Sequence, residues 1–172
     1  DKEDDYYRQL VKANDASLPS VLDQVQGKHD NNGARGVGEA VDPLAAAYCA
    51  PESSSFKSPA LLPILEAAAD KLLAAQHADG TIDSGNLSSP PDTGFVVQTV
   101  CTALAVLQRK NLPQLSSVNN KLERFLLAAG EALRAVDEID IRSIEMPAAA
   151  TSKPQLTEAF RNRVATIANV HG

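Results

Sequence analysis

The chain has 172 residues and a formal net charge of −6; it is 44% hydrophobic, 22% charged and only 4% aromatic. This is the composition of a globular domain, and a chain of this length can bury enough surface to form a core. The acidic balance argues against nucleic acid or an anionic membrane as a general partner, because either needs a basic surface. No apolar run is long enough for a transmembrane helix.

Alanine and leucine supply most of the apolar residues, and both favour helices. In the first half of the chain, apolar residues recur at helical spacing between polar breaks that contain glycine or proline. The pattern predicts two short helices over residues 2–13 and 15–26, and then a long surface loop over residues 28–39. It predicts a third helix over residues 42–50, which starts at an Asp-Pro pair, and a fourth over residues 58–76, which ends near Gln76.

The second half begins with a polar loop, Thr81–Pro91, after which Asp92 is expected to cap a helix over Thr93–Arg109. This helix is apolar on nearly every side, which predicts the most buried element of the fold. Ser116 or Ser117 is expected to start the next helix, followed by an irregular segment over residues 137–152. A last helix is expected over Leu156–Val170.

No convincing strand pair follows from the sequence, so the predicted fold class is all-α. We expect antiparallel helical hairpins in an incomplete (α/α) toroid-like arrangement, with a bundle around a central helix as the alternative. Residues 1–136 form the helical-hairpin part, and residues 137–172 add an irregular segment and a C-terminal helix to the same domain. Cys49 and Cys101 match no metal motif and are expected to be free, buried thiols.

The densest cluster of chemical groups lies between Gln76 and Asp92, in one loop and its two helix ends. Loops held by rigid helices often carry binding sites. Several of these residues also have ordinary structural explanations: Asp79-Gly80 as a turn, and Asp92 as a helix cap. The candidates for substrate binding are Asp79, Asp83, Ser88, Ser89 and Asp92.

The expected loop Lys28–Glu39 carries the only local cluster of positive charge, so we expect a site where it meets the Gln76–Asp92 loop. His77 is a candidate general base, and Arg35 is a candidate partner for an anionic substrate such as a uronate. The structural alternative for His77 is a charge that suits the end of its helix, with the ring on the terminal carbonyls and away from Arg35.

Residues 47–107 resemble the N-terminal region of secreted bacterial proteins of the heparinase II/III-like group. The most specific pieces are AYCAPES, LLAAQHADGTID and SPPDTGF. The resemblance implies a helical toroid, β-elimination or hydrolysis of acidic polysaccharides, an Asn, a His or Tyr and an Arg in the toroid cleft, and a secreted or periplasmic location. Elimination next to a carboxylate needs a group that stabilises the anion and a base that removes the proton. On this basis Asn86 and Arg35 are assigned to the first role, and His77 to the second. No cofactor or metal is expected. The resemblance fades after Gly130, and the chain is shorter than a whole toroid of this group.

The sequence therefore predicts a carbohydrate-active, polysaccharide lyase-like helical domain that acts on or binds an acidic, uronate-containing glycan. A glycoside hydrolase is the related enzymatic possibility, and whether the chain is an enzyme at all stays open. One alternative is a non-catalytic helical module that binds a partner or a glycan. Another is a terpene-cyclase-like toroid, in which Gln-x-x-Asp-Gly turns also recur, although the chain has no Trp and no Asp-rich metal motif.

Overall fold

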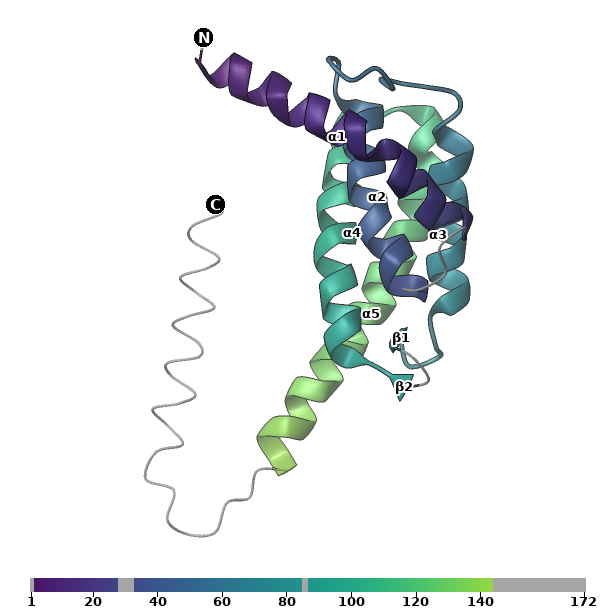
Figure 1. The fold of residues 1–172 in the computed structure, drawn as a ribbon. Helices are drawn as coiled ribbons and strands as arrows, with labels where there is room; N and C mark the ends of the chain where they lie inside the picture. Colours follow the sequence, from purple (N-terminus) through teal and green to yellow (C-terminus); the bar gives the residue numbers. More distant parts are fainter. Residues whose placement is uncertain (1, 28–32, 85–86, 144–172) are drawn as a thin grey trace. The chain divides into compact units, whose positions relative to one another are not determined.

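The computed structural model describes residues 2–27, 33–84 and 87–143 (Figure 1). Its contacts divide the chain into two units, Asp1–Asp137 and Glu138–Gly172, and the fold described below is that of the first. The described residues confirm the all-α class, with one minimal strand pair in addition. The expected helix over Leu156–Val170 lies outside the described residues.

Five α-helices follow one another along the chain. They are α1 (Lys2–Gln26), α2 (Gly33–Cys49), α3 (Leu62–Ala75), α4 (Pro90–Lys110) and α5 (Ser116–Ser143), the last preceded by a 3₁₀ turn, η1 (Pro113–Leu115). Between α3 and α4, the two-residue strands β1 (Asp83–Ser84) and β2 (Leu87–Ser88) pair antiparallel.

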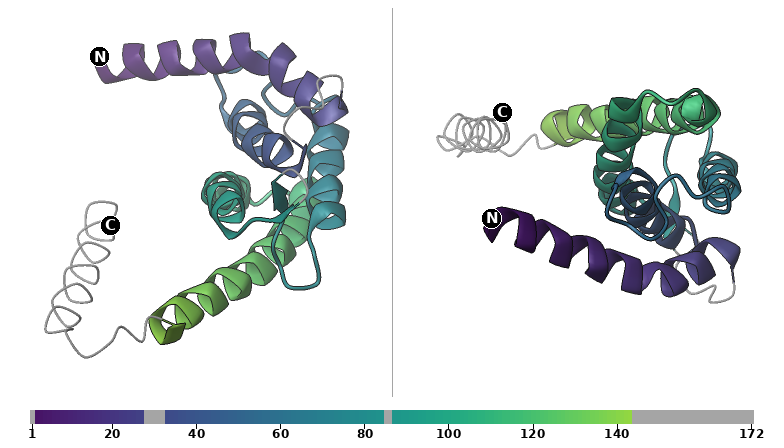
Figure 2. Two further views of the ribbon diagram at one scale, coloured as in Figure 1. Left: turned by 60° about the horizontal axis from the view of Figure 1, so that its bottom comes forward. Right: turned by 90° about the horizontal axis from the view of Figure 1, so that it is seen from above.

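The core is centred on α2, which packs against α1, α3 and α4 (Figure 2). More than half of its residues are buried, including Val41, Leu44 and Tyr48. The prediction that α4 is the most buried element is therefore wrong. Val100 and Leu107 of α4 are inaccessible to solvent, whereas Phe95 on its outer side is 54% exposed.

Contacts along α2 and α4 show that the two helices run in the same direction. Arg35 and Gly38 of α2 meet Asp92 and Val96 near the start of α4, and the ends of both helices line one groove. The same holds for α3 and α5, because Glu66 contacts Lys121 and, further along both helices, Gln76 contacts Phe125. Hairpins α2–α3 and α4–α5 therefore stack side by side with like helices adjacent.

The boundary of α2 is the largest correction to the sequence prediction. The segment Lys28–Glu39 is expected to be a loop, but residues 33–39 are the first two turns of α2. The Asp42-Pro43 pair, expected as a helix start, lies inside the helix. Gly36 and Gly38, which look like loop residues, are buried in α2. Because Gly38 has no Cβ, α4 can approach α2 closely at this position.

Three other boundaries differ from the predictions. The two expected N-terminal helices are one, because α1 continues through Pro19, and Ser17 donates to the carbonyl of Asn14 rather than capping a new helix. Helix α3 begins at Leu62, after turns over residues 51–61, rather than at Pro59. Residues 137–143, expected to be irregular, continue α5.

The cysteines differ from each other in burial. Both Cys49 and Cys101 are free thiols, as expected, but only Cys49 is buried. Cys101 lies on the exposed side of α4, so the prediction of two buried thiols is wrong for this residue.

Candidate functional site

The loop between α3 and α4 starts with a tight turn that is fixed to α5. Helix α3 ends where Gln76 takes an extended conformation, and its side-chain amide donates to the carbonyls of Gly80 and Phe125, each at 2.9 Å. Gly80 has a φ of +90°, and a Cβ placed there would lie 2.0 Å from the carbonyl oxygen of Ala128. Only glycine fits this position, because the obstacle is backbone.

Asp79 holds the inside of the same turn. Its Oδ1 accepts hydrogen bonds from the backbone N–H of Thr81 at 2.9 Å and from the hydroxyl of Thr81 at 2.7 Å. These bonds lower the pKa of Asp79 below its usual value of 3.8. Asp79 therefore has the structural role in a turn that the sequence also allowed, and its side chain is exposed.

The far end of the loop closes on the start of α4. Ile82 is fully buried, its N–H donates to the hydroxyl of Thr93, and its carbonyl accepts from the N–H of Ser89. Ser89, and not Asp92 as predicted, is the N-cap of α4, because its side chain accepts from the Asp92 N–H. The strand pair β1–β2 lies between these two anchors along the chain.

His77 and Asp83 form a polar pair on the surface of the loop. The Nε2 of His77 lies 2.7 Å from Oδ1 of Asp83, and the two side chains are 42% and 48% exposed. The hydrogen bond of His77 thus goes to a carboxylate and not to the terminal carbonyls of α3. A carboxylate that accepts a hydrogen bond from one ring nitrogen holds the imidazole in one orientation.

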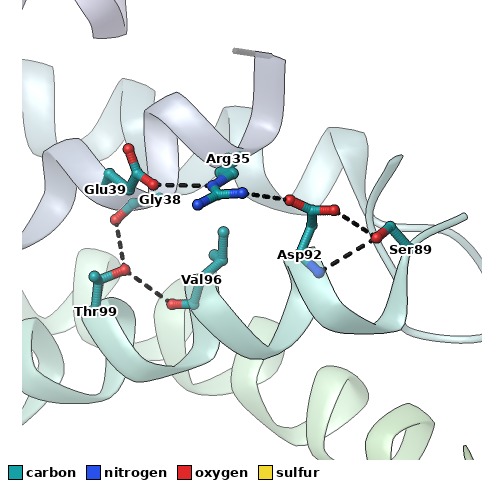
Figure 3. A network of polar contacts seen from close by, with 7 residues as sticks. All are labelled: Arg35, Gly38, Glu39, Ser89, Asp92, Val96 and Thr99. Carbon is teal, nitrogen blue, oxygen red and sulfur yellow. Dashed lines mark hydrogen bonds and ion pairs between the residues drawn. The ribbon is translucent and has the colours of Figure 1, made fainter. Parts of the chain in front are cut away.

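Arg35 and Asp92 join the start of α2 to the start of α4 (Figure 3). The guanidinium lies 2.7 Å from Oδ1 of Asp92 and 3.0 Å from Oε1 of Glu39, and it stacks over the ring of Phe95 at 4.8 Å. The second carboxylate oxygen of Asp92 accepts from the hydroxyl of Ser89 at 2.5 Å. The contact predicted between the two segments is therefore present.

The same geometry limits what Arg35 can do. Hydrogen bonds to Glu39 and then to Asp92 raise the pKa of Arg35, so the group stays charged. Two carboxylates already share that charge, which leaves little attraction for a third anion. In this structure Arg35 links α2 to α4 through its ion pair with Asp92.

The structure thus brings some of the predicted residues together and separates their roles. Arg35, Asp92 and Ser89 form one cluster, and His77 and Asp83 form another. Ser88 is exposed in β2, where its backbone pairs with Asp83. Asn86, the other predicted anion-stabilising residue, lies outside the described residues.

A second feature, which the sequence analysis missed, is an apolar groove of about 580 Å³. It lies between the first half of α1 and the ends of α2 and α4. Its walls are lined by Tyr7, Leu10, Val11, Asn14, Ala46, Ala47, Cys49, Ala50, Pro51, Val106, Arg109 and Lys110. The signal in the sequence was Tyr7, Leu10 and Val11 at helical spacing in a helix whose opening turns are otherwise polar.

Within the described residues, no group of three or more His, Cys, Asp or Glu side chains is placed to hold a metal ion. In the same part of the chain, no helix combines the length and the apolar character needed to cross a membrane.

In comparisons with known proteins, no family model matches the chain, and neither a curated protein nor a solved structure matches it.

Proposed function

We propose that the chain is the helical-hairpin part of a polysaccharide lyase-like, carbohydrate-active protein, and that its glycan contacts the loop over residues 76–89. The observation that carries this proposal is the exposed pair His77–Asp83, with Nε2 and Oδ1 2.7 Å apart, on a loop anchored at both ends. Stacked hairpins with like helices adjacent are also what a part of an (α/α) toroid requires.

His77 is the base of the proposed site. In the neutral tautomer that donates Nε2–H to Asp83, Nδ1 carries the lone pair and can accept a proton. Asp83 then stabilises the imidazolium that forms, and this is the usual task of a carboxylate behind a histidine base. Asp79, Ser88 and the second carboxylate oxygen of Asp83 are acceptors for sugar hydroxyl groups.

The proposed mechanism also needs a residue that stabilises the substrate carboxylate. Arg35 is held by Glu39 and Asp92, so this role passes to Asn86 in the proposed mechanism. An amide donates hydrogen bonds to an anion without carrying a charge of its own, which makes it a weaker stabiliser than a free guanidinium. If Asn86 does not supply this interaction, the loop binds the glycan without cleaving it.

The test is a panel of uronate-containing and neutral polysaccharides, with ultraviolet absorbance for unsaturated products and calorimetry for binding. We expect both signals to fall at least about tenfold in His77→Ala and in Asp83→Asn. Glu123→Gln, an exposed carboxylate change on α5, is the matched control and should change neither. Binding without product supports the glycan-binding form of the proposal. A folded protein that gives neither signal contradicts the proposal.

A second candidate function is a non-catalytic module that binds a protein partner. The observation that favours it is the apolar groove between α1, α2 and α4. This groove is at the ends of α2 and α4, whereas the Arg35–Asp92 ion pair is at their starts. Mutations at His77 leave this function unchanged, whereas mutations in the groove remove it.

A further inference from the structure

The first half of α1 extends beyond the other helices (Figures 1 and 2). Every residue from Lys2 to Leu10 is exposed, although Tyr6, Tyr7 and Leu10 are large and partly or wholly apolar, with 65%, 42% and 52% of their surfaces exposed. The described residues have only two other large, exposed apolar side chains, Phe95 and Leu127. Such a cluster on one helix marks an interaction surface.

The apolar strip continues into the groove. Its lining combines Tyr7, Leu10 and Val11 of α1 with Val106 of α4 and with small residues at the end of α2 and just after it, namely Ala46, Ala47 and Ala50. These small residues let another helix approach closely, as in complexes where an amphipathic helix lies in an apolar groove. The shape therefore fits a helix with large apolar side chains on one face.

The charges at the groove and at the start of α1 indicate which helix would fit. The last turn of α4 places Arg109 and Lys110 at the groove, whereas the first turn of α1 carries Glu3, Asp4 and Asp5. A helix with acidic residues beside large apolar ones complements the Arg109–Lys110 side. The first half of α1 is itself such a helix.

We propose that this surface binds a second copy of the chain, with the first half of each α1 lying in the groove of the other copy. A two-fold interface places the same patch on both partners, so it must contain its own complement. This patch contains an acidic helix turn, a basic helix end and the apolar strip between them. In the dimer, Glu3 and Asp5 of one copy face Arg109 and Lys110 of the other, and Tyr6 and Leu10 become buried.

The experiment compares association of charge variants by sedimentation velocity and light scattering over a range of protein concentrations. The unchanged chain should form dimers whose dissociation constant rises with salt, because screening weakens the charge pairs. The double variants Glu3→Lys/Asp5→Lys and Arg109→Glu/Lys110→Glu should each dissociate at least about tenfold more readily alone. Mixed in equal amounts, the two should associate again, and misfolding cannot produce that result.

The matched control is Glu123→Lys/Arg124→Glu, a double charge change on the exposed side of α5 that should leave association unchanged. Leu10→Glu, at a position 52% exposed, removes the apolar contact without opening the core and should also give monomers. An unchanged chain that stays monomeric at all concentrations overturns the proposal. Failure of the two charge variants to associate when mixed also overturns it.

Discussion

Two polar segments with glycines, residues 33–39 and 76–89, contain similar residue types and have different structures. The first is helical and forms the contact between α2 and α4, where a Cβ on Gly38 would lie 2.5 Å from Cγ1 of Val96. The carbonyl of Gly38 also accepts from the hydroxyl of Thr99 at 3.0 Å (Figure 3). The described part of the second segment is mostly irregular, and His77, Asp79, Asp83 and Ser88 are exposed in it.

The difference lies in what each glycine does. Gly38 has ordinary helical geometry and is needed only for the space that it leaves free, whereas Gly80 needs both that space and a positive φ. A glycine that serves close packing strengthens the scaffold, and a glycine that serves a turn shapes an exposed loop. The first segment therefore supports the fold, and the second is free to carry function.

The largest expected effect comes from a charge in the packed region. Val100 is fully buried in α4, so Val100→Asp should cost more than about 4 kcal/mol of unfolding free energy, because the carboxylate has neither water nor a partner. Thr102→Asp on the exposed side of the same helix should change it by less than about 0.5 kcal/mol. Urea unfolding followed by circular dichroism measures both. Equal effects would contradict the burial of this side of α4.

Gly80→Ala should have the next largest effect. The substitution forces an L-residue to a φ of +90° and drives its Cβ into the backbone of Ala128, at a cost of about 3 kcal/mol or more. The control is Gly94→Ala in α4. A Cβ added there would meet no atom of another part of the fold within 4 Å, so alanine should stabilise the helix by about 0.5–1 kcal/mol. If Gly80→Ala is as harmless as Gly94→Ala, the loop is not anchored on α5 in this way.

Gly38→Ala should destabilise the α2–α4 contact by about 1–3 kcal/mol, because its obstacle is a side chain that can shift. In a Val96→Ala background the same change should be nearly neutral, which gives a coupling of about 1–3 kcal/mol in a double-mutant cycle. Thermal unfolding of the four proteins measures this coupling. Additive effects would mean that the two helices do not meet at Gly38 and Val96.

The smallest effect concerns two aspartates with opposite pKa shifts. Burial raises the pKa of Asp15, but hydrogen bonds from Ser53 and Ser54 outweigh it, so the pKa lies below 3.8 in the folded protein. Burial alone raises the pKa of Asp42 above 3.8. Asp15 therefore contributes stability above pH 3.8 that is lost as the pH falls through its lower folded pKa. The charge of Asp42 destabilises the fold at neutral pH, and protonation removes that effect.

Asp15→Asn should thus lower the unfolding free energy at neutral pH, and its difference from the unchanged chain should shrink as the pH falls below 3.8. Asp42→Asn should raise the unfolding free energy at neutral pH, and this gain should also disappear in acid. Denaturant titrations between about pH 3 and pH 7 separate the two. A gain in stability from Asp15→Asn at neutral pH would contradict the bonds to Ser53 and Ser54.

Helical periodicity was enough to predict the fold class and the end of α3, because both follow from the spacing of leucine and alanine. It was not enough to place the start of α2. Gly38 looks like a loop residue until the packing of α4 on it is known, and its contact residue Val96 is almost sixty residues further along the chain. Tertiary contacts decided the structure of this segment against its local propensity.

The candidate site was predictable in the same partial way. The polar cluster between Gln76 and Asp92 identified the loop, and opposite charge made an Arg35–Asp92 contact reasonable. Sequence could not show that Glu39, one helical turn from Arg35, would share the guanidinium, because this residue was expected in a loop. The groove was missed because its lining comes from three helices whose relative placement no local pattern encodes.

The central claim is that the segment over residues 76–89 contacts a glycan, while residues 33–39 only support it. Its most direct test is a titration of the isotope-labelled chain with uronate-containing and neutral oligosaccharides, followed by amide resonances in two-dimensional NMR. We expect resonances of residues 77–84 and Ser88 to shift with a saturable dependence on the ligand, and those of Gly36 to Glu39 to stay in place. No shift with any oligosaccharide, or shifts confined to the groove at Tyr7 and Arg109, would contradict the claim.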